Sequence, residues 1–87
     1  MPRSKKDKWC VYILECKDGS LYTGITKDLE KRINQHNRGA GCRYTKYRFP
    51  VRMLYNESCF SRPDALKREA EIKSWERNKK LRFIADG

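Results

Sequence analysis

The chain lacks several features that would place it in a common class. No apolar run approaches the roughly 18 residues of a membrane span, and there is no internal repeat, low-complexity tract or interdomain linker. Its four cysteines include no C-x-x-C pair, and no signal peptide is evident, so we expect reduced thiols in a cytoplasmic protein with no membrane partner. A zinc site that uses Cys42 and His36 is an alternative, but the spacing matches no closed structural motif.

Acidic residues are also scarce, because 11 Asp and Glu stand against 21 Lys and Arg in 87 residues, a formal net charge of +10. Basic side chains recur along nearly the whole length, which suits a face lying along a phosphate backbone. The expected partner is nucleic acid, DNA first, with RNA not excluded. The length allows one small core. We expect a disordered basic arm at residues 1–8 and a single domain at residues 9–84.

Two short aromatic and β-branched segments predict a β-hairpin. They are residues 9–16 (WCVYILEC) and residues 21–26 (LYTGIT). A two-residue loop at Asp18-Gly19 would put Tyr12 and Tyr22 on opposite faces of the hairpin. A three-residue loop that begins at Lys17 and has Gly19 in a left-handed conformation would put both tyrosines on one face. Gly24, two residues after Tyr22, indicates a close approach to the backbone there.

Two helices and a third strand are expected after the hairpin. The first helix should run to about Asn37, with Thr26 as N-cap, Asp28 in its first turn, and Leu29 and Ile33 facing the core. The remaining segments are a flexible basic loop at residues 38–47, a strand at residues 51–57, a helix at residues 64–79 and a short final helix within residues 75–84 that folds back on the sheet. Ser61-x-x-Asp64, with Pro63 in the first turn, has the form of a capping box and marks the start of the long helix.

Glu69 is the unusual residue of that helix. At about 100° per residue it falls between Ala65 and Leu66 on the core-facing stripe, whereas Glu71 points away from it. A carboxylate on such a stripe is unfavourable unless it is paired, hydrogen-bonded or bound to a metal. Helix geometry alone leaves both an ion pair with a basic neighbour and a metal site open.

In these positions the chain resembles the GIY-YIG nuclease superfamily. The motifs that carry the resemblance are Cys10-Val11-Tyr12, Tyr22-Thr23-Gly24, Thr26-x-Asp28-Leu29-x-x-Arg32-x-x-x-His36-Asn37, Thr45 and Ala65-Leu66-Lys67-Arg68-Glu69. They span residues 9–82, and the chain looks most like the short standalone bacterial members and the nuclease domain of a eukaryotic enzyme that cuts branched DNA. Cys10 and Thr23 depart from the usual glycine and aliphatic residue, and Asn78 is the only candidate for an asparagine near the family's site.

The resemblance implies an α/β (α+β) fold, in which helices flank a three-stranded antiparallel sheet, and phosphodiester hydrolysis that uses one Mg²⁺ or Mn²⁺ ion. Glu69 would bind the metal and Arg32 would stabilise the charge on the phosphate. Tyr12 or Tyr22 would position or deprotonate the attacking water, with His36 as the alternative proton acceptor. Both tyrosines must then reach one phosphate, which favours the three-residue turn.

The expected function is a metal-dependent endonuclease that cuts DNA, with branched or flapped structures in repair or recombination as candidate substrates. Nucleic-acid contacts are expected from Lys27, Arg38, Arg43, Tyr44, Lys46, Arg48 and Lys73. The alternatives are a non-catalytic nucleic-acid-binding module and a nuclease subunit whose protein partner selects the substrate. Glu69 favours the enzyme, because a carboxylate repels phosphate unless a metal intervenes.

Overall fold

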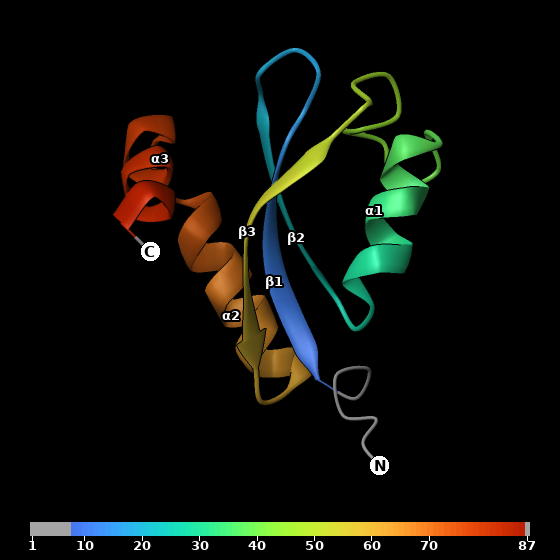
Figure 1. Cartoon of the computed structure of the whole chain (residues 1–87). Coiled ribbons are helices and arrows are strands. Elements are labelled where there is room, and N and C mark those ends of the chain that lie inside the picture. The colour runs from blue at the N-terminus through green and yellow to red at the C-terminus, as the bar shows by residue number, and fades with distance from the viewer. Residues whose placement is uncertain (1–7, 87) are drawn as a thin grey trace.

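The structure, a computed structural model, describes residues 8–86, so almost all of the expected N-terminal arm lies outside the described residues. The elements are β1 (Trp9–Glu15), β2 (Leu21–Thr26), α1 (Leu29–Asn37), β3 (Arg52–Cys59), α2 (Arg62–Lys73) and α3 (Arg77–Asp86). The strands form an antiparallel sheet in the order β2-β1-β3. Helix α1 lies on one side of this sheet, and α2 and α3 lie on the other (Figure 1). The expected three-stranded α+β fold is confirmed.

The β1–β2 hairpin has the three-residue turn. Cys16 N–H donates to Ser20 C=O (2.9 Å), Gly19 N–H donates to Cys16 C=O (2.9 Å), and Gly19 has φ +85°. A positive φ at this point is favourable for glycine, which has no Cβ. The register pairs Tyr12 with Gly24 and Leu14 with Tyr22. Because directly paired residues share a face, Tyr12 and Tyr22 lie on the same side of the sheet.

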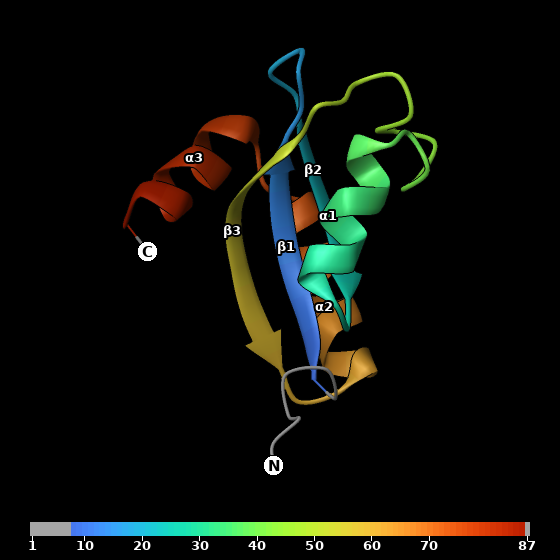
Figure 2. The ribbon, with the colours of Figure 1, turned by 45° about the vertical axis from the view of Figure 1, so that its right-hand side comes forward.

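The alternation of β1 divides the core into two layers. Val11 and Ile13 are fully buried against Ala65 and Ile72 of α2. The alternate side chains point to the opposite face of the sheet, where Tyr12, Leu14 and Cys16 are buried on the α1 side. Leu29 and Ile33 of α1 pack against them as predicted. Figure 2 shows this arrangement, with α1 in front of the sheet and α2 behind it. A central strand buried on both faces explains why residues 10–14 read as one continuous apolar run.

The two ends of α1 differ in part from expectation. The N-cap is Asp28 rather than Thr26, because the Asp28 carboxylate accepts from Lys31 N–H (3.2 Å). Thr26 instead accepts from Asp28 N–H (3.2 Å) through its hydroxyl. At the other end the Asn37 side chain accepts from Val51 N–H (2.5 Å) and donates to Val51 C=O (3.3 Å). These bonds occupy the backbone of Val51, and β3 begins one residue later than expected.

Helix α2 begins as the sequence predicts but ends early. The Ser61 hydroxyl caps it by accepting from Asp64 N–H (3.3 Å). The expectation of one helix over residues 64–79 is wrong, because α2 stops at Lys73 and α3 starts at Arg77. Ser74 explains the break, since its hydroxyl donates to Glu71 C=O (2.6 Å) and competes with the helical backbone bonds.

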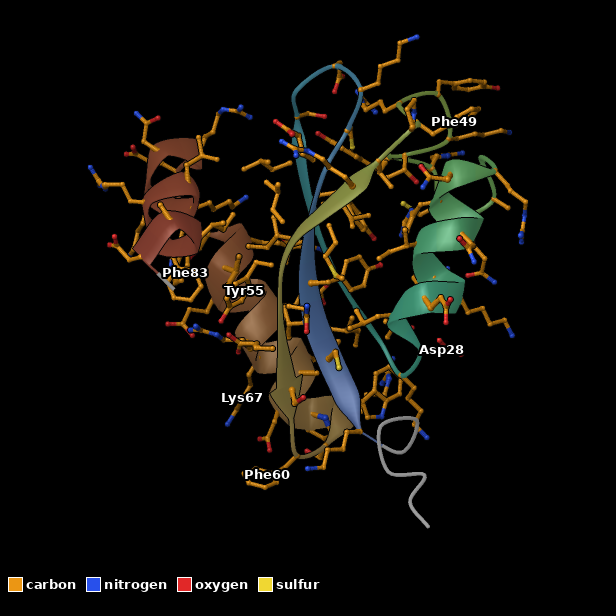
Figure 3. All side chains as sticks on the ribbon, in the orientation of Figure 1. Asp28, Phe49, Tyr55, Phe60, Lys67 and Phe83 are labelled. Carbon is orange, nitrogen blue, oxygen red and sulfur yellow. The ribbon has the colours of Figure 1, made fainter. Side chains whose placement is uncertain are left out.

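Helix α3 folds back on the sheet through an aromatic cluster. Phe83 packs edge-on against Trp75 (ring centroids 5.1 Å apart) and against Tyr55 of β3 (5.0 Å). Figure 3 shows Tyr55 and Phe83 turned toward one another between β3 and α3. The Arg68 guanidinium lies over both Trp75 and Phe83 and forms an ion pair with Glu57 (2.8 Å). This cluster joins β3, α2 and α3, and confirms the expected final helix.

Candidate active site

The site begins at Gly24, directly across from Tyr12. A Cβ at Gly24 would lie 2.6 Å from the Tyr12 hydroxyl oxygen and 3.0 Å from the Tyr22 ring. Glycine therefore leaves the space in which both phenol rings meet, as the sequence indicated. The ring centroids of Tyr12 and Tyr22 are 6.2 Å apart, and Tyr12 is only 1% exposed. Two hydroxyl groups from neighbouring strands thus converge on the α1 side of the hairpin.

Helix α1 supplies Arg32 and His36 to the same place. His36 is fully buried, and its Nε2 lies 3.0 Å from the Tyr12 hydroxyl. Its ring is 5.3 Å from that of Tyr22. Arg32, one turn earlier, is half-buried and donates to Gln35 (3.1 Å). A spacing of four residues brings both side chains to the sheet together, so His36 is not part of a solvated helix face.

The loop between α1 and β3 closes over His36. Thr45 Oγ1 lies 2.7 Å from His36 Nδ1, and Thr45 is itself fully buried. Gly41 packs so closely on the imidazole that a Cβ there would overlap the ring. The Cys42 Sγ lies 3.6 Å from Thr45 Oγ1. The histidine is consequently enclosed by α1, β1 and this loop.

The same loop is braced against the hairpin turn. Arg48 donates to the Asp18 carboxylate (3.0 Å) and to Tyr44 C=O (2.6 Å), and its guanidinium lies 4.3 Å from the centre of the Tyr44 ring. Tyr44 in turn stacks on Tyr22, with ring centroids 5.7 Å apart. Arg48 and Tyr44, both expected to contact nucleic acid, therefore hold the loop in place over the site.

Burial dominates the electrostatics of these groups. Burial, assisted by the Arg32 charge, lowers the pKa of His36 to about 4, so the imidazole is neutral near pH 7. Burial raises the pKa of both Tyr12 and Tyr22, and for Tyr12 the hydrogen bond and charge of Arg32 offset part of the rise. In the protein alone neither tyrosine has the lowered pKa that a general base needs.

Glu69 approaches the site from α2. Its side chain is 17% exposed, against 56% for Glu71, which matches the stripe predicted from the helical period. It forms an ion pair with Lys73 (3.1 Å), which is the basic-neighbour alternative that helix geometry left open. Its charge is also near enough to contribute to the raised pKa of Tyr12. The structure therefore brings Tyr12, Tyr22 and His36 together with Arg32 close by, whereas Glu69 acts on Tyr12 through its charge alone.

The donor set suits a hydrated cation better than a closed metal cage. Within residues 8–86 no group of three or more His, Cys, Asp and Glu side chains is placed to hold a metal ion. Both ring nitrogens of His36 already have protein partners, which argues against the zinc alternative with Cys42. A single half-buried carboxylate such as Glu69 fits Mg²⁺ or Mn²⁺, which keeps most of its water ligands. The Lys73 ammonium would have to move aside or share the carboxylate.

The remaining predicted nucleic-acid contacts are all exposed cations. They are Lys27, Arg38, Arg43, Lys46 and Lys73. Exposed aromatic side chains accompany them, with Tyr47 85% exposed in the loop and Phe60 93% exposed between β3 and α2. Figure 3 shows Phe60 at that turn, pointing away from the sheet. Asn78 is exposed on α3, and its relation to the site stays a prediction.

Two positions of the site carried little sequence signal. Gly41, in a run of small residues, reads as a loop glycine, although it packs on His36. Thr45 appeared only as part of the family pattern, and its bond to His36 joins residues nine positions apart across an irregular loop.

None of the helices among residues 8–86 is long and apolar enough to cross a membrane.

Comparison with known proteins agrees with this geometry. Residues 8–82 match the family model of the GIY-YIG catalytic domain, and the chain belongs to that family. This membership implies a nuclease, and GIY-YIG nucleases act on DNA.

Within the family the chain is similar to UPF0213 proteins. One from Staphylococcus saprophyticus is 56% identical over 81 residues, covering 93% of this chain and 99% of that protein. The solution NMR structure of the UPF0213 protein BH0048 from Bacillus halodurans is 42% identical, with a TM-score of 0.58 over 90% of this chain and 83% of that one. The protein EF2693 from E. faecalis, also solved by NMR, is 35% identical, with a TM-score of 0.59 over 95% and 88% of the two chains.

Proposed function

We propose that this protein is a Mg²⁺- or Mn²⁺-dependent endonuclease that hydrolyses DNA phosphodiester bonds, with branched or flapped DNA as its preferred substrate. The observation that carries the proposal is the gathering of two phenols and a guanidinium from β1, β2 and α1, with a half-buried carboxylate on α2 whose charge acts on Tyr12. A simple nucleic-acid binder has no use for a carboxylate so placed, because it repels phosphate.

Each residue has a role that its surroundings support. Glu69 would hold the cation, which when bound polarises the phosphate and stabilises the leaving oxygen. Arg32, half-buried on α1, would stabilise the charge that develops on the phosphate oxygens. Tyr12 and Tyr22 present their hydroxyls from one face of the hairpin and would position the attacking water.

The substrate would approach over the basic loop and the exposed face of α2. Arg38, Arg43 and Lys46 are exposed beside the site, and Lys73 lies one turn from Glu69. Basic side chains of this kind contact phosphates and do not read the base sequence, so we expect the protein to select its substrate by DNA structure. A protein partner that narrows the choice of substrate is compatible with so small a surface.

The decisive test compares Glu69→Gln with Glu71→Gln. The two substitutions remove the same charge from the same helix, but Glu71 is exposed and paired with Arg68. With Mg²⁺ or Mn²⁺ and labelled single-stranded, duplex, flap and four-way-junction DNA, Glu69→Gln should lower cleavage about 100-fold or more. Glu71→Gln should cleave like wild type, and both should bind DNA.

The pattern of cleavage also separates the alternatives. Normal cleavage by Glu69→Gln would show that the assigned site is wrong. Salt-sensitive binding without cleavage by any variant would favour a binding module or a nuclease subunit that needs its partner. Cleavage of flaps and junctions in preference to duplex would support the proposed substrate class.

A further inference from the structure

The imidazole of His36 lies between two hydroxyl groups and is sealed from solvent. Its Nδ1 faces Thr45 Oγ1 at 2.7 Å, and its Nε2 faces the Tyr12 oxygen at 3.0 Å. His36 and Thr45 are both 0% exposed. A neutral imidazole carries one ring proton, so one nitrogen donates and the other accepts. Which nitrogen carries the proton determines what His36 does to Tyr12.

The hydroxyl proton of Thr45 identifies the accepting nitrogen. Apart from His36 Nδ1, its neighbours are Cys42 C=O at 3.5 Å, which is long for a hydrogen bond from a hydroxyl, and Cys42 Sγ at 3.6 Å, which is only a weak acceptor. A buried hydroxyl without a good acceptor is unfavourable, so the Thr45 hydroxyl donates its hydrogen bond to Nδ1, which is therefore unprotonated. The two distances agree, because 2.7 Å is usual for a hydroxyl donor and 3.0 Å for a ring N–H donor.

We infer that Thr45 is a positioning residue, which fixes His36 in the tautomer that carries its proton on Nε2 and donates it to the Tyr12 oxygen. The inference rests on the proposed function only in its consequence for catalysis. His36 then cannot accept the Tyr12 proton, because the nitrogen that faces Tyr12 is already protonated. It acts as a hydrogen-bond donor toward the Tyr12 oxygen, whose pKa the Arg32 charge also lowers.

This arrangement directs the hydroxyl proton of Tyr12 away from His36. Because the Tyr12 oxygen accepts from His36, its own proton points away from the imidazole. Negative charge that develops on this oxygen is stabilised by the Nε2–H group and by the Arg32 guanidinium. Tyr22 has no such donor from His36 among the described residues, and the inference therefore distinguishes the two tyrosines.

The tautomer can be measured without any cleavage assay. His36 is the only histidine in the chain, so long-range ¹H–¹⁵N correlation spectra of the uniformly labelled protein report its ring without assignment work. Near pH 7 we expect an unprotonated Nδ1 and a protonated Nε2 in wild type. The opposite pattern would overturn the inference, whether or not the protein proves to be a nuclease.

Variants at Thr45 test the positioning role. Thr45→Ser keeps the hydroxyl and should keep the tautomer and the cleavage rate, whereas Thr45→Val keeps the shape but removes the donor. In Thr45→Val we expect the ring proton to be shared between both nitrogens and cleavage to fall about 10-fold or more, in line with loss of one supporting hydrogen bond. An unchanged single tautomer in Thr45→Val would overturn the role of Thr45. If Thr45→Val does not fold, the wild-type and Thr45→Ser spectra still decide, because a mismatch between them would also contradict the inference.

Discussion

Lowering the pH should reduce the free energy of unfolding through His36, because folding lowers the pKa of this buried histidine. Burial and the charge of Arg32 lower its pKa from 6.5 to about 4 in the folded protein. Between these values the unfolded chain binds a proton that the folded chain excludes, so stability falls as pH falls. The difference of about 2.5 pKa units corresponds to a loss of about 3 kcal/mol, complete once pH drops below the folded value. Above about pH 6.5 both states are neutral at His36, and this contribution vanishes.

The assay is urea unfolding in metal-free buffer at a series of pH values from pH 7 to about pH 4, followed by tryptophan fluorescence of Trp9 and Trp75. Wild type is compared with His36→Gln, which keeps a polar side chain but cannot titrate. Carboxylates contribute equally to both curves, so the difference between the two slopes isolates His36. We expect the free energy of unfolding of wild type to fall more steeply, by about 3 kcal/mol over the range.

The absolute stability of His36→Gln does not matter to this test, because only the slopes are compared. Parallel pH dependences would refute the reasoning, since they would mean that His36 titrates alike in the folded and unfolded chains. The ring resonances used for the tautomer give a second reading. If the His36 imidazole of the folded protein became protonated near the ordinary histidine pKa of 6.5, it could not be a buried, neutral group.

Two further substitutions test the site at other points. Arg32→Ala should reduce cleavage far more than DNA binding, whereas Arg38→Ala, which removes one exposed cation, should weaken both together. Cleavage is measured in single-turnover assays and binding by fluorescence anisotropy. Equal losses of cleavage and binding in Arg32→Ala would make Arg32 a simple phosphate contact. Gly24→Ala should displace the Tyr12 phenol, lower stability by about 1–3 kcal/mol and impair cleavage, because the new Cβ would lie 2.6 Å from the Tyr12 hydroxyl; a wild-type urea midpoint and cleavage rate would contradict the tight packing at Gly24.

Local patterns predicted the elements of this fold well. The Asp18-Gly19 turn and the Ser61 cap each depend on residues close in sequence, and each appears in the structure as expected. The helical period likewise separated the half-buried Glu69 from the exposed Glu71. Turns, caps and the periodic burial of a helix depend on residues close in sequence, so a single sequence can show them.

Contacts made by the irregular loop between α1 and β3 could not be predicted from the sequence. The enclosure of His36 depends on Thr45 and Gly41, whose approach is set by a loop without helical or strand periodicity. Loops of this kind follow from tertiary packing, here from the brace between Arg48 and Asp18 and from the stacked ring of Tyr44. The complete burial of His36 could not be predicted for the same reason, because the residues that cover it come from this loop.

The position of the site follows from the order of the strands. Tyr12 faces α1, whereas Glu69 belongs to α2 on the opposite face of the sheet, yet the two are close enough to interact electrostatically. Groups on opposite faces can meet only around an edge, and β2 is an edge strand in the order β2-β1-β3 that α2 also contacts. Had the connection after α1 placed β3 beside β2, that edge would be covered and the carboxylate separated from the phenols. The crossover of β3 to the far side of β1 is therefore what leaves β2 as an edge strand of the sheet.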